Sequence, residues 1–194
     1  MIRDFSVFSK LNFSKLTDLG LFLQAMLNFS MKSLPCPYCG AKKPSWKHHG
    51  VYTRYLISFK NNHCVTSLIT IDRVICSSCD HTHAILPDIL IPHSSYGILF
   101  IIQVLRDYFK KSFTVEHLCE RYQISISTLY AWKKLFLLHK KLWLGILEDS
   151  IVSVSAFLNW IPSIRLSKEL SIFFQSQRFS FLQGISKTMH SGSP

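Results

Sequence analysis

Two pairs of cysteines are the residues in this chain whose spacing points most directly to chemistry. Cys36 and Cys39 form one Cys-x-x-Cys pair, Cys76 and Cys79 form a second, and 36 residues lie between the pairs. The two thiolates of such a pair can converge in a tight turn, and four thiolates at about 2.3 Å close a tetrahedral zinc site. Because four protein ligands leave no position for water or substrate, we predict one structural zinc ion.

The alternative interpretation is a set of buried or redox-active thiols, because a single Cys-x-x-Cys pair also supports thioredoxin-like chemistry. Two pairs that flank a predicted β-hairpin favour zinc instead. Gly40 and Asp80 directly follow the two pairs, at the point where such a turn needs a residue that tolerates a positive φ.

Other residues of metal-binding types lie near the cysteine pairs: His48, His49, His63, Cys64, His81 and His83. His81 and His83 are close enough to the second pair to replace a cysteine. Since four thiolates already satisfy the metal, we expect these two to be solvent-facing or strand-end histidines. Cys64 falls at the predicted hairpin tip, far from the metal, and is expected to be a free thiol.

The stretch VEHLCERYQISISTLYAWKK, residues 115–134, fits the frame of a helix-turn-helix. Cys119 stands where the two helices touch, a position that needs a small residue. Gln123 stands in the turn where glycine is usual, which implies either a left-handed residue or a slightly wider turn. Four apolar residues take the inward positions and two serines can cap the second helix: Leu118, Ile124, Leu129, Trp132, Ser125 and Ser127. An ordinary helical hairpin is the alternative.

The polar surface left on the second helix favours a DNA partner. Short polar side chains at the start of a recognition helix can approach base edges, and lysines suit phosphates. Further lysines surround this helix at 110, 111, 140 and 141. We predict that double-stranded DNA is contacted by Ser125, Ser127, Thr128, Tyr130, Ala131, Lys133 and Lys134.

The order of predicted elements gives the fold class. A helix is expected over 14–29, two strands over 50–59 and 64–76 with a turn at 60–63, a connector over 86–97, and helices over 97–111, 114–122 and 126–141. The prediction is an α+β protein, with a small zinc-ribbon β-hairpin module followed by a helix-turn-helix module. The expected parts are an N-terminal helical segment (1–33), the zinc ribbon (34–92), the helix-turn-helix (93–141), and a C-terminal helical segment with its tail (142–194).

The charge of the chain points to an anionic partner. Lys and Arg outnumber Asp and Glu by 22 to 11, the formal charge is +11, and the pI is near 9.5. No acidic residue lies between Asp18 and Asp72. The longest apolar stretches, 19–29 and 96–105, are too short to cross a bilayer, and the N-terminus lacks the pattern of a signal peptide. We therefore expect a cytoplasmic protein, whose reducing surroundings favour metal ligation over disulfides.

With both motifs in place, the chain resembles a family of uncharacterised bacterial proteins related to the N-terminal regions of transposases. The resemblance covers roughly residues 34–136 and is carried by the segments CPYCG, HHGVYTRY, RVICSSCDHTHAILPDILIPHSSY and FTVEHLCERYQISISTLYAWKK. It implies DNA binding and an origin in a mobile element. It also implies that the four paired cysteines are the zinc ligands and that 125–134 is the recognition helix, and it carries over no catalytic residue.

Catalysis is not expected. Transposases with an acidic triad hold two metal ions with three carboxylates on an α/β core. The only acidic residues among the 53 residues after Lys141 are Glu148, Asp149 and Glu169. We expect a DNA-binding protein derived from, or accessory to, a mobile element. Its further partner would be a separate transposase or a second copy, with no small-molecule substrate. The alternative is a cationic adaptor acting on RNA or at a membrane surface, suggested by 19–29 and by Phe13 beside Lys10 and Lys15.

Overall fold

The structure is a computed structural model that describes residues 2–4, 17–31, 34–146, 158 and 166–184. This part of the chain is α+β, as predicted. Its strands are β1 (Ile2–Asp4), β2 (Trp46–Lys60), β3 (His63–Cys76) and β4 (Thr82–Pro87), and its helices are α1 (Asp18–Asn28), α2 (Ile98–Phe109), α3 (Val115–Tyr122), α4 (Ile126–Ile146) and α6 (Leu166–Gln177).

The sheet is built on the long antiparallel hairpin of β2 and β3. Asn61 and Asn62 connect the two strands with φ angles of 49° and 65°, and asparagine is among the few residues that enter this left-handed region readily. The turn predicted at 60–63 is therefore confirmed. β3 also pairs antiparallel with β4, and β4 pairs parallel with β1, which gives the order β1-β4-β3-β2.

β2 begins at Trp46, earlier than the predicted start at Gly50. The added residues are mostly polar, so no alternation of apolar residues marked them as strand. Gly50 has a φ of 151° at a register shift between His48 and Gly50. A bulge at this point adds a residue to β2 and increases the local twist of the hairpin.

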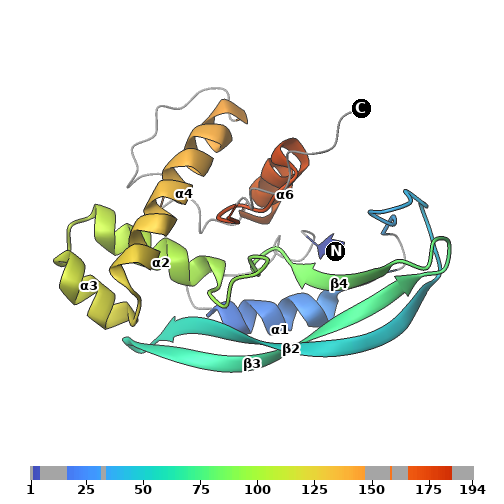
Figure 1. Cartoon of the computed structure of the whole chain (residues 1–194), viewed down its shortest axis with the longest axis horizontal. Helices are drawn as coiled ribbons and strands as arrows, with labels where there is room; N and C mark the ends of the chain where they lie inside the picture. Colours follow the sequence, from blue (N-terminus) through green and yellow to red (C-terminus); the bar gives the residue numbers. More distant parts are fainter. Residues whose placement is uncertain (1, 5–16, 32–33, 147–157, 159–165, 185–194) are drawn as a thin grey trace.

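Figure 1 shows how the elements are arranged around the hairpin. The hairpin forms a long curved base, with α1 and α2 on its concave side. The pair α3 and α4 lies at the hairpin tip, while the two cysteine turns lie at its open end. The cysteine turns and the helices α3 and α4 thus lie at opposite ends of the hairpin.

One hydrophobic cluster runs through all the helices and the hairpin. It includes Leu21 of α1, Leu56 of β2, Leu129 of α4 and Phe173 of α6. The ring of Phe100 on α2 contacts four other aromatic rings in this cluster. Their centroid distances lie in the range of 4.5–7 Å that is typical of favourable aromatic pairs. The neighbours of Phe100 are Tyr96 at 5.3 Å, Tyr122 at 5.8 Å, Trp132 at 6.1 Å and Phe59 at 6.4 Å. The β part and the helical part therefore share one core.

Helix α2 is capped by a residue from another helix. Its own N-cap, Gly97, has no side chain for the task. The carboxylate of Asp18 accepts hydrogen bonds from the backbone N–H groups of Leu99 at 2.9 Å and Phe100 at 3.1 Å. A Cβ atom at Gly97 would overlap the Asp18 side chain, so glycine is required for this contact. The N-terminus of α1 is capped by Thr17, whose hydroxyl accepts the N–H of Gly20 at 3.2 Å.

The end of α4 packs against the segment that follows α6. α4 continues to Ile146, beyond its predicted end at 141. His139 is fully buried, its Nδ1 accepts the N–H of Leu182 at 2.8 Å, and three phenylalanine rings lie within 6 Å of it. Burial lowers the pKa of His139 to about 4, so the ring is neutral at physiological pH.

No helix in the described part of the chain is both long and apolar enough to cross a bilayer. Several expectations fall outside the described residues: residues 14–16 of the first predicted helix, Lys10, Phe13 and Lys15, and most of the segment 142–194, including Glu148 and Asp149.

The buried Asp18 carboxyl predicts a pH-dependent stability. Burial raises its pKa from 3.8 to about 7 against the opposing effect of the two backbone hydrogen bonds. Since the folded protein binds this proton more tightly than the unfolded chain, the contribution of Asp18 to stability decreases as pH rises from about 4 to about 7. The full change is at most about 4 kcal/mol.

The measurement compares the free energy of unfolding of the native protein with that of Asp18→Asn across this pH range. Groups that titrate in both proteins cancel in the difference. The native protein should lose stability relative to Asp18→Asn as pH rises. A difference that is flat or rises with pH would contradict the prediction.

Candidate functional site

The first cysteine pair lies in a turn closed by two backbone hydrogen bonds. The N–H of Gly40 donates to the carbonyl of Cys36 at 2.9 Å, and the N–H of Cys36 donates to the carbonyl of Ala41 at 2.9 Å. Gly40 has a φ of 73°, a conformation that glycine adopts without strain. The positive φ predicted after this pair is confirmed.

The second pair repeats this geometry. The N–H of Asp80 donates to the carbonyl of Cys76 at 2.9 Å, the N–H of Cys76 donates to the carbonyl of His81 at 3.0 Å, and Asp80 has a φ of 55°. The positive φ predicted for Asp80 is also confirmed. Each turn thus presents its two sulfur atoms on the same side, although the two sequences share little beyond the cysteines.

The hairpin brings the two turns together. Trp46 is paired with Cys76 at the open end of β2 and β3, and the N–H of Ser77 donates to the carbonyl of Ser45 at 3.1 Å. The residues that lead out of the first turn are therefore bonded directly to those that lead into the second. This explains how a spacer of 36 residues is compatible with one compact site.

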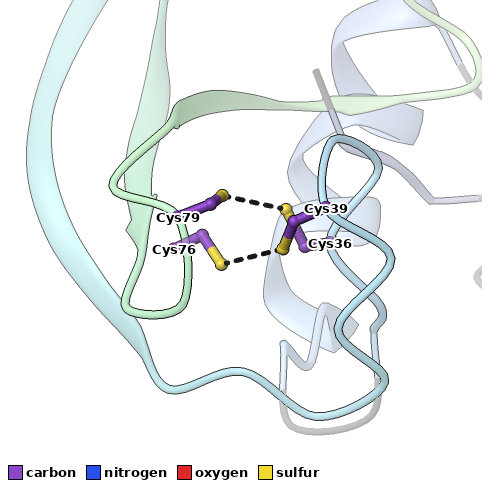
Figure 2. A group of neighbouring side chains, drawn as sticks. All are labelled: Cys36, Cys39, Cys76 and Cys79. Carbon is purple, nitrogen blue, oxygen red and sulfur yellow. Dashed lines mark hydrogen bonds between the residues drawn. The ribbon is translucent and has the colours of Figure 1, made fainter.

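The four sulfur atoms face one another in a compact group (Figure 2). All four lie within 4.8 Å of each other, with Cys36 at 3.8 Å from Cys79 and Cys39 at 4.0 Å from Cys76. A tetrahedral ion with metal–sulfur bonds of about 2.3 Å would separate its sulfur ligands by about 3.8 Å. The four cysteines are free thiols, and their arrangement could hold a metal ion.

The electrostatics of the cluster oppose its full ionisation in the absence of a cation. Burial disfavours the Cys36 thiolate, but backbone N–H groups of Cys39 and Tyr38 outweigh this effect and lower the pKa of Cys36 to about 6. The N–H of His81 favours the Cys79 thiolate, but burial and the neighbouring thiols raise the pKa of Cys79 to about 12. A divalent cation at this position would offset part of the repulsion between four adjacent thiolates.

His83 lies at the start of β4, as the strand-end alternative predicted, but it is buried rather than solvent-facing. It is 5% exposed, and its Nε2 lies 3.5 Å from the sulfur of Cys36. Its ring packs edge-on against Trp46 at 5.6 Å. An imidazole N–H beside a ligating sulfur orients that ligand and moderates its charge. The alternation along β4, which places His83 on the same side as buried Ile85, was the available signal.

The remaining histidines and Cys64 do not join the cluster. His48, His49 and His63 are exposed. His81 is also exposed, as predicted, and stacks on Tyr38 at 3.4 Å. Cys64 lies at the hairpin tip, where its thiol donates to the carbonyl of Tyr122 at 3.1 Å.

The helices α3 and α4 are joined by a short turn. Gln123 closes α3 with a φ of 49°, so the left-handed alternative holds. The N–H of Ile124 donates to the carbonyl of Cys119 at 3.0 Å, and the Ser125 hydroxyl accepts the N–H of Thr128 at 3.1 Å. Cys119, predicted at the contact between the two helices, is buried. The residues predicted to face inward are buried too: Leu118, Ile124, Leu129 and Trp132.

The hairpin tip anchors this helix pair. The guanidinium of Arg121 donates to the side chain of Asn62 at 2.7 Å and lies 5.3 Å from the ring of Phe59. Cys64 bonds the last residue of α3, as described above. The tip therefore fixes where α3 ends, and through the short turn it fixes where α4 begins.

The predicted DNA-contacting residues lie along the first turns of α4. Ser125, Ser127, Tyr130, Ala131 and Lys134 are exposed. Thr128 is half-buried, and the hydroxyl of Ser125 lies 2.8 Å from those of both Ser127 and Thr128.

Lys133 differs from its neighbours. It is half-buried, and its ammonium donates to the hydroxyl of Tyr108 at 2.9 Å and lies over the rings of Tyr108 and Tyr130.

Comparisons with known proteins place the chain in a family without an assigned function. Neither curated proteins nor solved structures show a detectable match. A family described as "Domain of unknown function (DUF6431)" matches residues 36–132, and the match provides no link to transposases. The matched region begins at the first cysteine, ends at Trp132 of α4 and covers half of the chain. The protein therefore belongs to the DUF6431 family.

Proposed function

We propose that this protein is a zinc-containing, sequence-reading binder of double-stranded DNA. The observation that carries the proposal is the division of α4 into two sides. Leu129 and Trp132 face the core. The exposed residues at the start of the helix are mostly small or polar, with Ile126 as the apolar exception. This is the composition that a recognition helix needs, because short side chains allow the backbone of the helix to approach the base edges.

The cysteine end would serve as a scaffold and as a second contact to phosphate. The first turn is followed by Lys42, Lys43 and Lys47, all exposed. The described residues from 19 to 71 contain no acid, so the local potential at this end attracts anions. The hairpin of 14 residue pairs separates the cysteine cluster from α4 by roughly 45 Å, which is about one and a third turns of duplex DNA.

The four-cysteine group would hold a metal ion that prefers thiolate ligands, for which we propose zinc. Thiolates are soft ligands, and a compact tetrahedral set of four favours zinc or iron. Charge neutralisation supports this further, because a divalent cation offsets the repulsion between adjacent thiolates. The ion would be structural, since no ligand position remains for chemistry.

We propose no catalytic activity. Among the described residues, the four cysteines are the only group of ligand-type side chains close enough to hold a metal ion. An origin in a mobile element, with a separate transposase or a second copy as partner, remains part of the proposal. It is suggested by the resemblance noted in the sequence.

A membrane-surface adaptor is the second candidate. Leu23 and Leu27 on α1 are 53% and 84% exposed, which is unusual for leucines on one short helix. Such side chains could enter a lipid interface beside the positive charge of the chain. The experiment on α4 below includes the comparison that separates the two candidates.

The first prediction from this proposed function concerns the metal. Cys76→Ser should abolish binding of one zinc per chain and unfold the cysteine end, because structural zinc contributes about 10–16 kcal/mol in small domains. Elemental analysis and thermal unfolding measure the two effects. Cys64→Ser is the matched control, since it removes a thiol at the far end of the hairpin, keeps a hydroxyl donor, and should retain the zinc. Purified native protein without zinc would contradict the prediction.

The second prediction separates base reading from phosphate contact. A preferred site is first selected from random duplexes. Lys134→Ala should then weaken binding to every sequence and reduce the log–log salt slope by about one. Ser127→Ala combined with Tyr130→Ala should instead reduce the preference for the site by about 1–3 kcal/mol per lost base contact.

Two results would count against base reading by α4. One is that no duplex is enriched, and the other is that the double variant keeps its full preference for the selected site. Co-sedimentation with anionic vesicles at the same salt tests the membrane candidate, with Leu23→Ser and Leu27→Ser as the variants that should release the protein. Binding to vesicles but not to duplexes would favour that candidate.

The third prediction is that pure protein neither nicks nor joins DNA strands in the presence of Mg²⁺ or Mn²⁺. Supercoiled plasmid and duplexes that carry the selected site are the substrates. Cleavage that co-purifies with the protein and is lost in Glu148→Ala or Glu169→Ala would overturn it.

A further inference from the structure

A cavity lies between the middle of the sheet and the connector that follows β4. It has a volume of about 470 Å³ and is lined by Tyr52 and Arg54 of β2, Ala84 and Leu86 of β4, and the loop 92–95. No Asp or Glu is among these lining residues. The cavity is far from the cysteine cluster along β2, and the function proposed above does not use it.

The guanidinium of Arg54 is half-buried in the wall of this cavity without a carboxylate partner among the lining residues. Its Nη2 donates to the backbone carbonyls of Ile91 and Ser94. These two bonds hold the group in place but carry no negative charge. Burial lowers the pKa of Arg54, which reflects the cost of an incompletely compensated cation away from water.

Several hydrogen-bond donors remain available around the cavity. Arginine has five N–H groups, and the two carbonyls and the side chain of Tyr52 use only some of them. His93 and Ser95 line the same space and are exposed, and Tyr52 adds a phenol. Ser94 is occupied within the loop, because its hydroxyl bonds both the N–H and the carbonyl of Tyr96.

We propose that this cavity binds a phosphate group. A fixed guanidinium fork with an imidazole, a hydroxyl and a phenol around it matches the tetrahedral set of acceptor oxygens on phosphate. The bound anion would supply the negative charge that the Arg54 side chain lacks. Since the cavity is open on one side and has apolar walls at Ala84 and Leu86, the phosphate could be free or part of a larger molecule.

The position of the loop 92–95 connects this site to α4. The same loop forms one wall of a second cavity of about 750 Å³, whose other wall includes Ala131, Trp132 and Leu135. A DNA backbone that follows the exposed side of α4 past Ala131 would therefore reach the loop next. This source of the phosphate rests on the proposed function, whereas a small phosphate ester would not.

The first arm of the test needs no DNA. Inorganic phosphate is titrated into the full-length, metal-loaded protein by calorimetry at constant ionic strength, with chloride as the exchanged anion. Arg54→Gln should raise the dissociation constant about tenfold or more, because hydrogen bonds to charged groups are the strong ones. Gln keeps an amide donor for the two carbonyls. Arg178→Gln, which removes an exposed arginine beyond α6, is the matched control and should bind as the native protein does.

Two further variants keep the test decisive if Arg54→Gln fails to fold. His93 has a φ of 61°, a conformation that asparagine tolerates, so His93→Asn changes the side chain while preserving the loop. Ser95→Ala removes an exposed hydroxyl. Each should weaken phosphate binding several-fold without changing the metal content or the midpoint of thermal unfolding.

The second arm identifies the source of the phosphate. With the selected duplex, Arg54→Gln should reduce the log–log salt slope by about one, and Arg178→Gln should leave it unchanged. If Arg54-dependent phosphate binding is seen but the slope is unchanged, or no duplex is enriched, the cavity stands as a site for a small phosphate ester. In the latter case the proposed function fails by itself. If neither phosphate binding nor the slope depends on Arg54, His93 or Ser95, the proposal is overturned, even where α4 reads DNA.

Discussion

The register of the β2–β3 hairpin is the constraint on which both ends of this molecule depend. A shift of one residue would turn every side chain to the opposite face of the sheet. It would also separate Trp46 from Cys76 and thereby pull the two cysteine turns apart. The register is set at the tip by Asn61 and Asn62, whose left-handed conformations suit a tight hairpin turn. The same tip then holds the end of α3 through Asn62 and Cys64.

The core explains why the two ends behave as one body. Phe100 of α2 contacts aromatic rings from β2, α3, α4 and the connector. The N-terminus of α2 is capped by the carboxylate of Asp18 from α1. A helix N-terminus leaves several N–H groups without partners. Here the carboxylate of Asp18 accepts two of them, although Asp18 lies 81 positions before Leu99 in the sequence. That arrangement costs the desolvation of a carboxyl group, and it orients α1, α2 and the Gly97 turn relative to one another.

The cysteine cluster brings together four groups that ionise to a negative charge, and the Arg54 cavity holds a guanidinium with no Asp or Glu among its lining residues. At the cluster, four thiols meet where backbone N–H groups favour ionisation of Cys36, which favours a cation. At the cavity, a guanidinium is fixed by neutral carbonyls, which favours an anion. Arg54 lies on β2 and Cys76 ends β3, so the hairpin that positions the helix pair also contributes residues to both sites.

Much of this architecture was predictable from local pattern. Four predictions that depend on a few neighbouring residues were correct. They concern the approach of the two cysteine pairs, the turn at the two asparagines, the positive φ after each cysteine pair, and the inward apolar positions of α3 and α4. The burial of His83 beside Cys36, the capping of α2 by Asp18, the polar start of β2 and the cavity around Arg54 were not predicted. These features arise where segments distant in sequence meet. Local propensity and periodicity encode how a residue relates to its neighbours along the chain, whereas the partner of a buried polar group is decided only when the tertiary fold brings the segments together.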